Sequence, residues 1–279
     1  MTDWLDYEDA YAGGGARIAG TVKVMRDVRS EELGNARDIL VYLPPSYPTA
    51  NRTYPTLYMH DGQNLFDEAT SFAGEWRVDE ALEDAADEGF EAIVVGIPNT
   101  GVERMQEYSP FKDPRFGGGR AADYVKFVVD TVKPLVDHAF RTTGDREATA
   151  TIGSSMGGMI SLYAFFERPE VFGAVGAVSP SVGFARGALI EYLDRARFVG
   201  GRIYLDVGTG EGLPRGRDPL ELRREPAIYV KMVREARDLL IRKGYQEGRD
   251  LLYVEEEGAL HNEAAWAERF PQLLRFLLK

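Results

Sequence analysis

The sequence predicts an α/β fold: a mostly parallel β-sheet with helices on both faces. Short apolar runs rich in β-branched residues recur along the chain, and most are separated by segments with the three- and four-residue apolar spacing of helices. The 279 residues can bury a substantial core, and 44% hydrophobic with 28% charged residues is typical of a globular protein. We therefore expect residues 1–279 to form a single catalytic domain, with 1–19 as a flexible or peripheral lead-in.

About eight strands are expected. The first two are joined through residues 30–35, which leave no room for a helix, so they should pair antiparallel at the sheet edge. From the third strand onward, helical crossovers predict parallel pairing. The expected strands lie near 20–27, 37–44, 54–60, 91–97, 148–153, 173–179, 201–207 and 250–256.

Helices are best supported at about 75–88, 120–139, 156–167, 219–243 and 263–278. Three irregular segments leave the carboxyl ends of strands, the edge at which open α/β sheets bind ligands. These segments are 61–74, 98–119 and 208–218. The connection at 180–200 is too short for a large helical lid, so we expect an open site walled by loops.

The bulk composition excludes several classes of partner. A formal charge of −12 repels nucleic-acid phosphates and anionic lipid surfaces. The absence of cysteine excludes disulfides and thiolate metal sites. The acidic start lacks the basic and apolar regions of a signal peptide, and no apolar run reaches membrane-spanning length. A cytoplasmic protein without membrane or nucleic-acid partners is expected, and homo-oligomerisation stays open.

The most informative segment is Gly153-Ser154-Ser155-Met156-Gly157, a Gly-x-Ser-x-Gly motif between a predicted strand and a predicted helix. This context is typical of the nucleophile elbow of the α/β-hydrolase fold, in which a tight turn presents the central serine at a helix N-terminus. The alternative is a glycine-rich β-to-α turn with a capping serine. We identify Ser155 as the candidate nucleophile.

A serine hydroxyl needs a general base, and histidine suits that role near neutral pH. The hydrolase order of serine, acid and histidine requires one after Ser155, and only His261 follows it. Alternatively, His261 is a surface residue at a helix start. His60 beside Asp61 could suggest a metal, but no second histidine is near them in sequence, so a loop-stabilising hydrogen bond is favoured and no metal is expected.

The acid that orients the histidine should follow the seventh strand. Glu211 lies in the loop proper and is the preferred candidate. Asp206, within the strand, and Asp218, further along the loop, remain alternatives. Acyl chemistry also needs donors for the oxyanion, for which the main-chain N–H groups of Met156 and Gln63 are the candidates.

The chain resembles the "putative esterase" family of α/β hydrolases, which includes enterochelin-type siderophore esterases, feruloyl and acetyl-xylan esterases, and S-formylglutathione hydrolases. The resemblance covers residues 20–278 and rests on the nucleophile elbow together with 41–47, 57–66, 97–99, Arg104, 107–110, 261–263 and Trp266. It implies cofactor-free hydrolysis of a small-molecule ester through an acyl-enzyme. The acid departs from the expected aspartate, because the preferred candidate is a glutamate.

Asp61, Asn99, Arg104 and Tyr108 are possible substrate contacts. Arg104 and the Glu107-Tyr108 pair could instead tie their loop down through an ion pair. A basic cluster could receive an anionic acyl group, although solvated helix-start charges are the simpler interpretation. It comprises Arg215, Arg217, Arg223 and Arg224.

Two other functions remain open. An acyl-enzyme can transfer its acyl group to a sugar or thiol acceptor, and a hydrolase scaffold can serve as a noncatalytic binding module. The sequence does not indicate the acyl or alcohol groups of the substrate.

Overall fold

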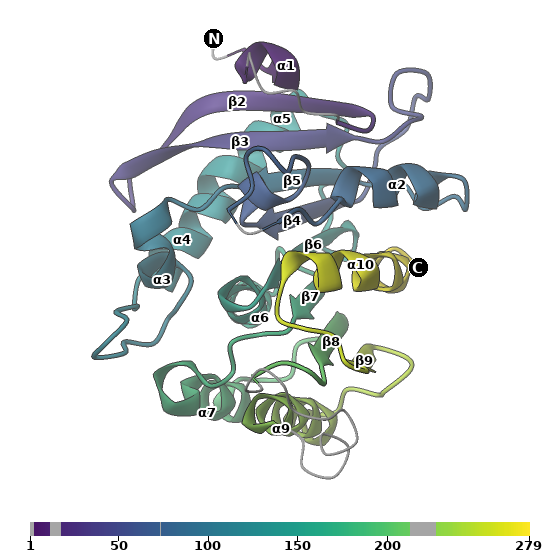
Figure 1. Ribbon diagram of the computed structural model, residues 1–279. Coiled ribbons are helices and arrows are strands. Elements are labelled where there is room, and N and C mark those ends of the chain that lie inside the picture. Colours follow the sequence, from purple (N-terminus) through teal and green to yellow (C-terminus); the bar gives the residue numbers. More distant parts are fainter. Residues whose placement is uncertain (1–2, 12–17, 73, 213–226) are drawn as a thin grey trace.

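The computed structural model describes residues 3–11, 18–72, 74–212 and 227–279. One nine-stranded sheet runs through it in the order β1-β2-β3-β5-β4-β6-β7-β8-β9 (Figure 1). The strands are β1 (Leu5–Asp6), β2 (Thr21–Ser30), β3 (Asn35–Leu43), β4 (Thr56–His60), β5 (Ile93–Ile97), β6 (Thr149–Ser154), β7 (Ala174–Val178), β8 (Arg202–Gly208) and β9 (Leu251–Glu256).

The pairing confirms the predicted fold class. Strand β2 is antiparallel to β1 and β3, and β3 is antiparallel to β5. From β5 through β4 to β9, every neighbouring pair is parallel. The eight expected strands are all present, and the ninth is the two-residue β1, too short to show any periodicity in sequence. The lead-in therefore contributes an edge strand, while residues 12–17 lie outside the described residues.

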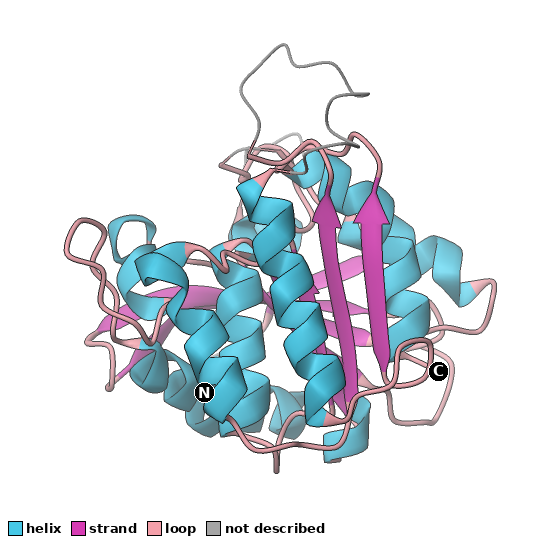
Figure 2. Cartoon of the chain, turned by 90° about the horizontal axis from the view of Figure 1, so that it is seen from below, coloured by secondary structure: helices cyan, strands magenta, loops and turns pink. Residues whose placement is uncertain are grey.

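Helices cover both faces of the sheet (Figure 2). One face packs against α1, α2 and α10, and the other against α4 to α7 and α9. Strands β4 to β7 are buried along their whole length, as expected where helices cover both sides. The helices are α1 (Tyr7–Ala10), α2 (Val78–Ala86), α3 (Arg104–Glu107), α4 (Ala121–Lys126), α5 (Lys133–Ala139), α6 (Met156–Glu167), α7 (Ala188–Arg195), α9 (Ile228–Lys243) and α10 (Glu263–Leu277), with short helical turns η1 (Gly62–Asn64), η2 (Gly101–Glu103), η4 (Arg146–Ala148) and η5 (Phe184–Gly187).

The helix expected over 120–139 is not a regular α-helix. A π-helical segment, η3 (Phe127–Val132), separates α4 from α5. Pro134 has no N–H to donate to the carbonyl of residue 130, which favours a change of hydrogen-bond pattern just before it. The 180–200 connection contains η5 and α7, which the sequence analysis missed. The helix expected over 219–243 is described from Ile228 onward. None of the helices in the described ranges is long and apolar enough to cross a membrane.

Candidate active site

Ser155 stands on a strained turn between β6 and α6. Its backbone angles are φ 56° and ψ −118°, a conformation that a non-glycine residue adopts only when its surroundings enforce it. The turn is held by hydrogen bonds from Ser155 N to Val178 O (2.9 Å) and from Ser181 N to Ser155 O (2.9 Å). Met156 is the first residue of α6, so its N–H has no acceptor within the helix.

His261 lies on the loop between β9 and α10, immediately before the residue that caps the helix. The Asn262 side chain accepts a hydrogen bond from Ala265 N (3.0 Å), which starts α10 at Glu263. The His261 ring meets the rings of Tyr229 and Trp266 edge to face, with centroids 5.3 and 5.0 Å away. The cap and these two aromatic contacts fix the direction in which the imidazole points.

Glu211 and His261 meet because the loops after β8 and β9 interlock. Gly210 N donates to Ala259 O (3.0 Å), and Gly258 N donates to the Thr209 hydroxyl (2.8 Å). A Cβ on Gly208 would lie 2.2 Å from Ala259 O, so only glycine permits this approach.

The imidazole contacts the carboxylate through a defined nitrogen. His261 Nδ1 lies 2.7 Å from Oε2 of the fully buried Glu211. A carboxylate only accepts hydrogen bonds, so Nδ1 carries the proton and Nε2 is left with its lone pair. This tautomer can remove a proton from a neighbouring hydroxyl.

A buried network around Ser179 and Arg269 contacts both Glu211 and Asp206. The Ser179 hydroxyl donates to Glu211 Oε1 (2.5 Å) and accepts from Arg269 Nη2 (3.0 Å). Asp206 accepts from Arg269 Nε (2.7 Å) and from Ser179 N (2.8 Å). Asp206 thus belongs to a structural ion pair and does not bond to His261, while Asp218 lies outside the described residues. Sequence reasoning missed Ser179 and Arg269 altogether.

Ser155 and His261 line the same cavity, of about 880 Å³. Met156 is buried beneath it at the start of α6. Phe72 and Val102, which sequence reasoning did not single out, also line the cavity, although their side chains are 92% and 90% exposed. The other lining residues are Asp61, Gln63, Asn64, Thr70, Ser71, Asn99, Gly101, Arg104, Ser154, Glu263 and Trp266.

Asp61 and Arg104 form a charged pair on the cavity wall. Arg104 Nε and Nη2 each lie 2.7 Å from an oxygen of Asp61, and Asn99 Nδ2 donates to Asp61 Oδ1 (2.7 Å). Burial alone would raise the pKa of Asp61, but Arg104 and Asn99 hold this pKa below its usual range. Glu263, which also lines the cavity, differs from Asp61, because burial raises the pKa of its carboxyl group.

Two buried neighbours, Glu107 and Tyr108, stabilise the loop that carries Arg104. Tyr108 is fully buried, accepts a hydrogen bond from Asp61 N (3.0 Å) and lies under the Arg104 guanidinium. Tyr108 is not among the residues that line the cavity, whereas the other three candidate substrate contacts, Asp61, Asn99 and Arg104, are. Glu107 forms a buried ion pair with Arg37, at 2.9 Å between Oε2 and Nη1. The 98–119 segment is therefore tied down by two ion pairs, one to Asp61 and one to Arg37.

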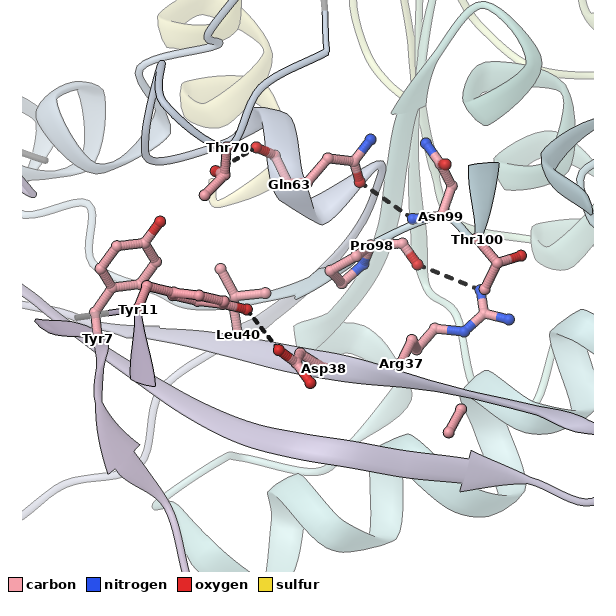
Figure 3. A pocket seen from close by; sticks show the side chains of 11 residues that line it. Tyr7, Tyr11, Arg37, Asp38, Leu40, Gln63, Thr70, Pro98, Asn99 and Thr100 are labelled. Carbon is pink, nitrogen blue, oxygen red and sulfur yellow. Dashed lines mark hydrogen bonds between the residues drawn. The ribbon is translucent and has the colours of Figure 1, made fainter. Parts of the chain in front are cut away.

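Gln63 also lines a second cavity, of about 400 Å³, which Figure 3 shows. Its side-chain carbonyl accepts from Asn99 N (3.1 Å), and its main-chain carbonyl accepts from the Thr70 hydroxyl (2.8 Å). Both cavities are lined by Gln63, Thr70 and Asn99. Hydrogen bonds to Thr70 and to Asn99 therefore hold Gln63 between the two cavities.

His60 is a buried, neutral histidine outside this cavity. Its two ring nitrogens lie 2.9 Å from the Tyr124 hydroxyl and 3.1 Å from the Thr151 hydroxyl. Burial lowers the pKa of His60 to about 4. Within the described residues, the carboxylates close enough to share a metal ion are those of Glu75, Asp79 and Glu80, and none of them lines the cavity.

Known proteins match the chain over most of its length. A family model described as "Putative esterase" matches residues 30–277. Uncharacterized protein YbbA from Bacillus subtilis is 27% identical over 261 residues, which cover 91% of this chain and 97% of that protein. The siderophore triacetylfusarinine C esterase of Aspergillus fumigatus is 28% identical over 76% of this chain and 78% of its own length.

Solved structures share the fold. The ferric enterobactin esterase of Salmonella typhimurium superposes with a TM-score of 0.70 at 21% identity, over 94% of this chain and 59% of that one. The chain belongs to the putative-esterase family, and it is a carboxylic ester hydrolase.

Proposed function

We propose that the protein hydrolyses esters through an acyl-enzyme on Ser155, with His261 as general base and Glu211 as the residue that orients it. The observation that carries this assignment is the 2.7 Å contact between His261 Nδ1 and Glu211, at the edge of the cavity that Ser155 also lines. Nε2 is then the basic atom of the ring.

The reaction follows from these positions. Ser155 Oγ attacks the ester carbonyl while His261 Nε2 takes its proton. Nε2 then returns the proton to the departing alcohol as the tetrahedral intermediate collapses to the acyl-enzyme. A water molecule, deprotonated by the same nitrogen, attacks the acyl group and releases the acid. The main-chain N–H groups of Met156 and Gln63 donate to the oxyanion in both steps.

The cavity supports a bulky ester as substrate. Phe72 and Val102 present exposed apolar surface at its lining, and Arg104 keeps part of its side chain, 24%, accessible beside Asp61. An apolar group on either side of the ester can cover Phe72 and Val102, while Arg104 and Asn99 offer donors to its polar atoms. One of the relatives is described as an esterase of the siderophore triacetylfusarinine C.

The test is the Ser155→Ala variant. Its kcat/KM for a small activated ester is expected to fall by about four orders of magnitude or more, because Ser155 is the residue that the strained turn presents at the start of α6. Ser181→Ala is the matched control: Ser181 Oγ lies 3.1 Å from Ser155 Oγ, and this variant should keep most activity. A cooperative thermal unfolding transition should confirm that both variants are folded.

Two outcomes would favour the other functions. Failure of a fluorophosphonate to label folded wild-type protein at Ser155 would indicate a noncatalytic binding module. Preferential transfer of the acyl group to an added sugar or thiol, rather than to water, would indicate an acyltransferase. Retention of activity by Ser155→Ala contradicts the assignment of the nucleophile.

A further inference from the structure

Three carboxylates converge at the start of α2, in a part of the molecule that ester hydrolysis does not use. They belong to Glu75, Asp79 and Glu80, and one oxygen of each lies within 4.8 Å of the others. Arg77, between them, has the left-handed backbone angles φ 55° and ψ 46° as the residue that precedes α2. This turn brings Glu75 back to the first turn of the helix, beside Asp79 and Glu80.

Two oxygens of this cluster are buried without a hydrogen-bond donor. Asp79 is fully buried; its Oδ2 accepts from Ala19 N (2.7 Å), but its Oδ1 has no partner in the described parts of the chain. Oε2 of Glu80 is buried and unpartnered in the same way, while its Oε1 forms a largely exposed ion pair with Arg77. Each buried acceptor left without a partner costs free energy, and adjacent carboxylates add repulsion.

Such a pair of oxygens is stable only with a proton or a cation between them. A proton on Asp79 can satisfy only one neighbouring oxygen. A cation satisfies all three.

The ligand chemistry indicates which cation. An all-oxygen set of carboxylates selects hard divalent ions. Ca²⁺ binds oxygen at about 2.3–2.6 Å, so its ligand atoms can lie up to about 5 Å apart, whereas Mg²⁺ requires about 2.0–2.1 Å and gives up its water shell reluctantly. Separations of no more than 4.8 Å are compatible with Ca²⁺, and the complete burial of Asp79 favours the ion that gives up its water more readily.

We propose that Glu75, Asp79 and Glu80 form a Ca²⁺ site. It joins three segments: the lead-in, through the bond from Ala19 N to Asp79; the first turn of α2; and the loop that begins after β4. That loop is already tied to the helix start by bonds from Trp76 N to Asn64 O (2.8 Å) and from Val78 N to Leu65 O (3.0 Å). The ion therefore stabilises the segment that carries Gln63 and Phe72.

The experiment uses the full chain, freed of metal with a chelator and exchanged into chelator-free buffer at about pH 8. Titration with CaCl₂ in a calorimeter should give one site per chain. Thermal unfolding should show Tm rising by about 5 °C at about a hundredfold excess over Kd. MgCl₂ at the same concentration should give a clearly smaller rise. These readouts do not depend on esterase activity, so they stand or fall separately from the proposed function.

Asp79→Asn and Glu75→Gln should lose the Ca²⁺-dependent rise in Tm, and Asp84→Asn should keep it. Asp84 is exposed on the same helix, so it matches the charge change outside the cluster. In Asp79→Asn the new amide retains an acceptor for Ala19 N and removes repulsion, so this variant should fold at least as well as the metal-free wild type. Glu75→Gln, at a half-buried position, provides a second variant.

Three results would overturn the proposal. The first is that CaCl₂ gives neither calorimetric heat nor a change in Tm. The others are that Asp79→Asn gains as much Tm with Ca²⁺ as the wild type, or that Mg²⁺ raises the Tm of the wild type as much as Ca²⁺ does. Arg17, outside the described residues, is a cation close in sequence to Ala19. If Ca²⁺ raises Tm only in an Arg17→Ala variant, a side chain rather than an ion neutralises the cluster in the native protein.

Discussion

Ser179 separates the roles of the two acidic residues that follow it. Its main-chain N–H donates to Asp206, and its hydroxyl donates to Glu211. A serine hydroxyl has a single proton, so the Trp266 indole and the Arg269 guanidinium can approach Ser179 Oγ only as donors, at 3.2 and 3.0 Å. Glu211 Oε1 is thereby occupied, and Oε2 is directed to His261.

Glu211→Gln is predicted to lower kcat by about 10²–10⁴-fold with little change in Tm. The amide cannot hold the imidazole in the tautomer that leaves Nε2 basic, but it fills the same volume. Steady-state kinetics on an activated ester, together with thermal unfolding, measure both quantities.

Asp206→Asn is the control, with the opposite result expected. Asp206 neutralises the buried Arg269, so its loss should destabilise the protein by about 3–5 kcal/mol while the folded fraction keeps most of its kcat. If Asp206→Asn abolishes turnover and Glu211→Gln does not, the acid has been assigned to the wrong carboxylate.

The candidate site residues that the sequence predicts are those with a local signal. Ser155 lies in a motif between a strand and a helix, and His261 is the only histidine after it. Ser179 and Arg269 are 90 positions apart and neither belongs to a recognisable pattern, so only the packing of α10 against β7 and β8 brings them together.

At the level of elements, the two glycines of the nucleophile turn have unequal roles. A Cβ on Gly153 would lie 2.6 Å from the backbone carbon of Gly157, so β6 or α6 would have to move. A Cβ on Gly157 would meet only Asp61 Oδ2 at 3.4 Å and His60 Cβ at 3.5 Å, which are ordinary contacts.

Gly153→Ala is therefore predicted to destabilise the protein by about 1–3 kcal/mol and to cut kcat by about 10²-fold or more through displacement of Ser155. Gly157→Ala should keep Tm or raise it, since alanine favours helix by up to about 1 kcal/mol over glycine. Urea unfolding and kcat on the two variants provide the comparison. If both substitutions lower stability and kcat equally, the need for glycine in this turn comes from its backbone conformation and not from a clash of the added Cβ.

The 98–119 segment depends on the buried pair of Arg37 and Glu107. Arg37→Met alone is predicted to cost about 3–5 kcal/mol, because it leaves the Glu107 carboxylate buried without its cation. The double variant Arg37→Met/Glu107→Leu should recover part of this loss. Urea denaturation measures both values.

Arg195→Met provides the exposed control for this pair. Arg195 and Glu191 form an ion pair in which the side chains are 80% and 73% exposed, so its loss should cost less than about 1 kcal/mol. For the buried pair, the loss of unfolding free energy in Arg37→Met/Glu107→Leu could equal the sum of the losses in the two single variants. That result would show that Arg37 and Glu107 do not stabilise each other.

The regular elements were more predictable than their interruptions. Strands β2 to β9 and helices α2, α6 and α10 have apolar patterns dictated by the core, so their residue types indicate them directly. The π-helical segment η3 and the short β1 arise from a missing donor and from tertiary pairing, which apolar spacing does not record.

Over the whole molecule, several carboxylates are buried in a chain whose formal charge is −12. Arginine neutralises several of them with direct contacts, in the pairs Asp61–Arg104, Glu107–Arg37 and Asp206–Arg269. Asp79 has no such partner within the described ranges, so the protein's stability should depend on the protonation of this group.

Asp79→Asn is predicted to remove the larger part of a loss of stability between about pH 6.5 and 8 in the metal-free protein, while Glu75, whose pKa burial raises to about 7, accounts for a smaller part. An unfolded aspartate is ionised above about pH 4, whereas burial and Glu80 raise the folded pKa of Asp79 to about 8. In this window the folded state binds the extra proton, so the free energy of unfolding falls as pH rises, by about 2 kcal/mol from Asp79. His60 contributes little here, because its folded pKa of about 4 lies below the window and its unfolded value lies at the window's lower edge. Urea unfolding with chelator at both pH values gives the difference between wild type and variant, and Asp84→Asn should behave like the wild type. An equal loss in Asp79→Asn would show that this carboxylate is already ionised in the folded protein at the lower pH.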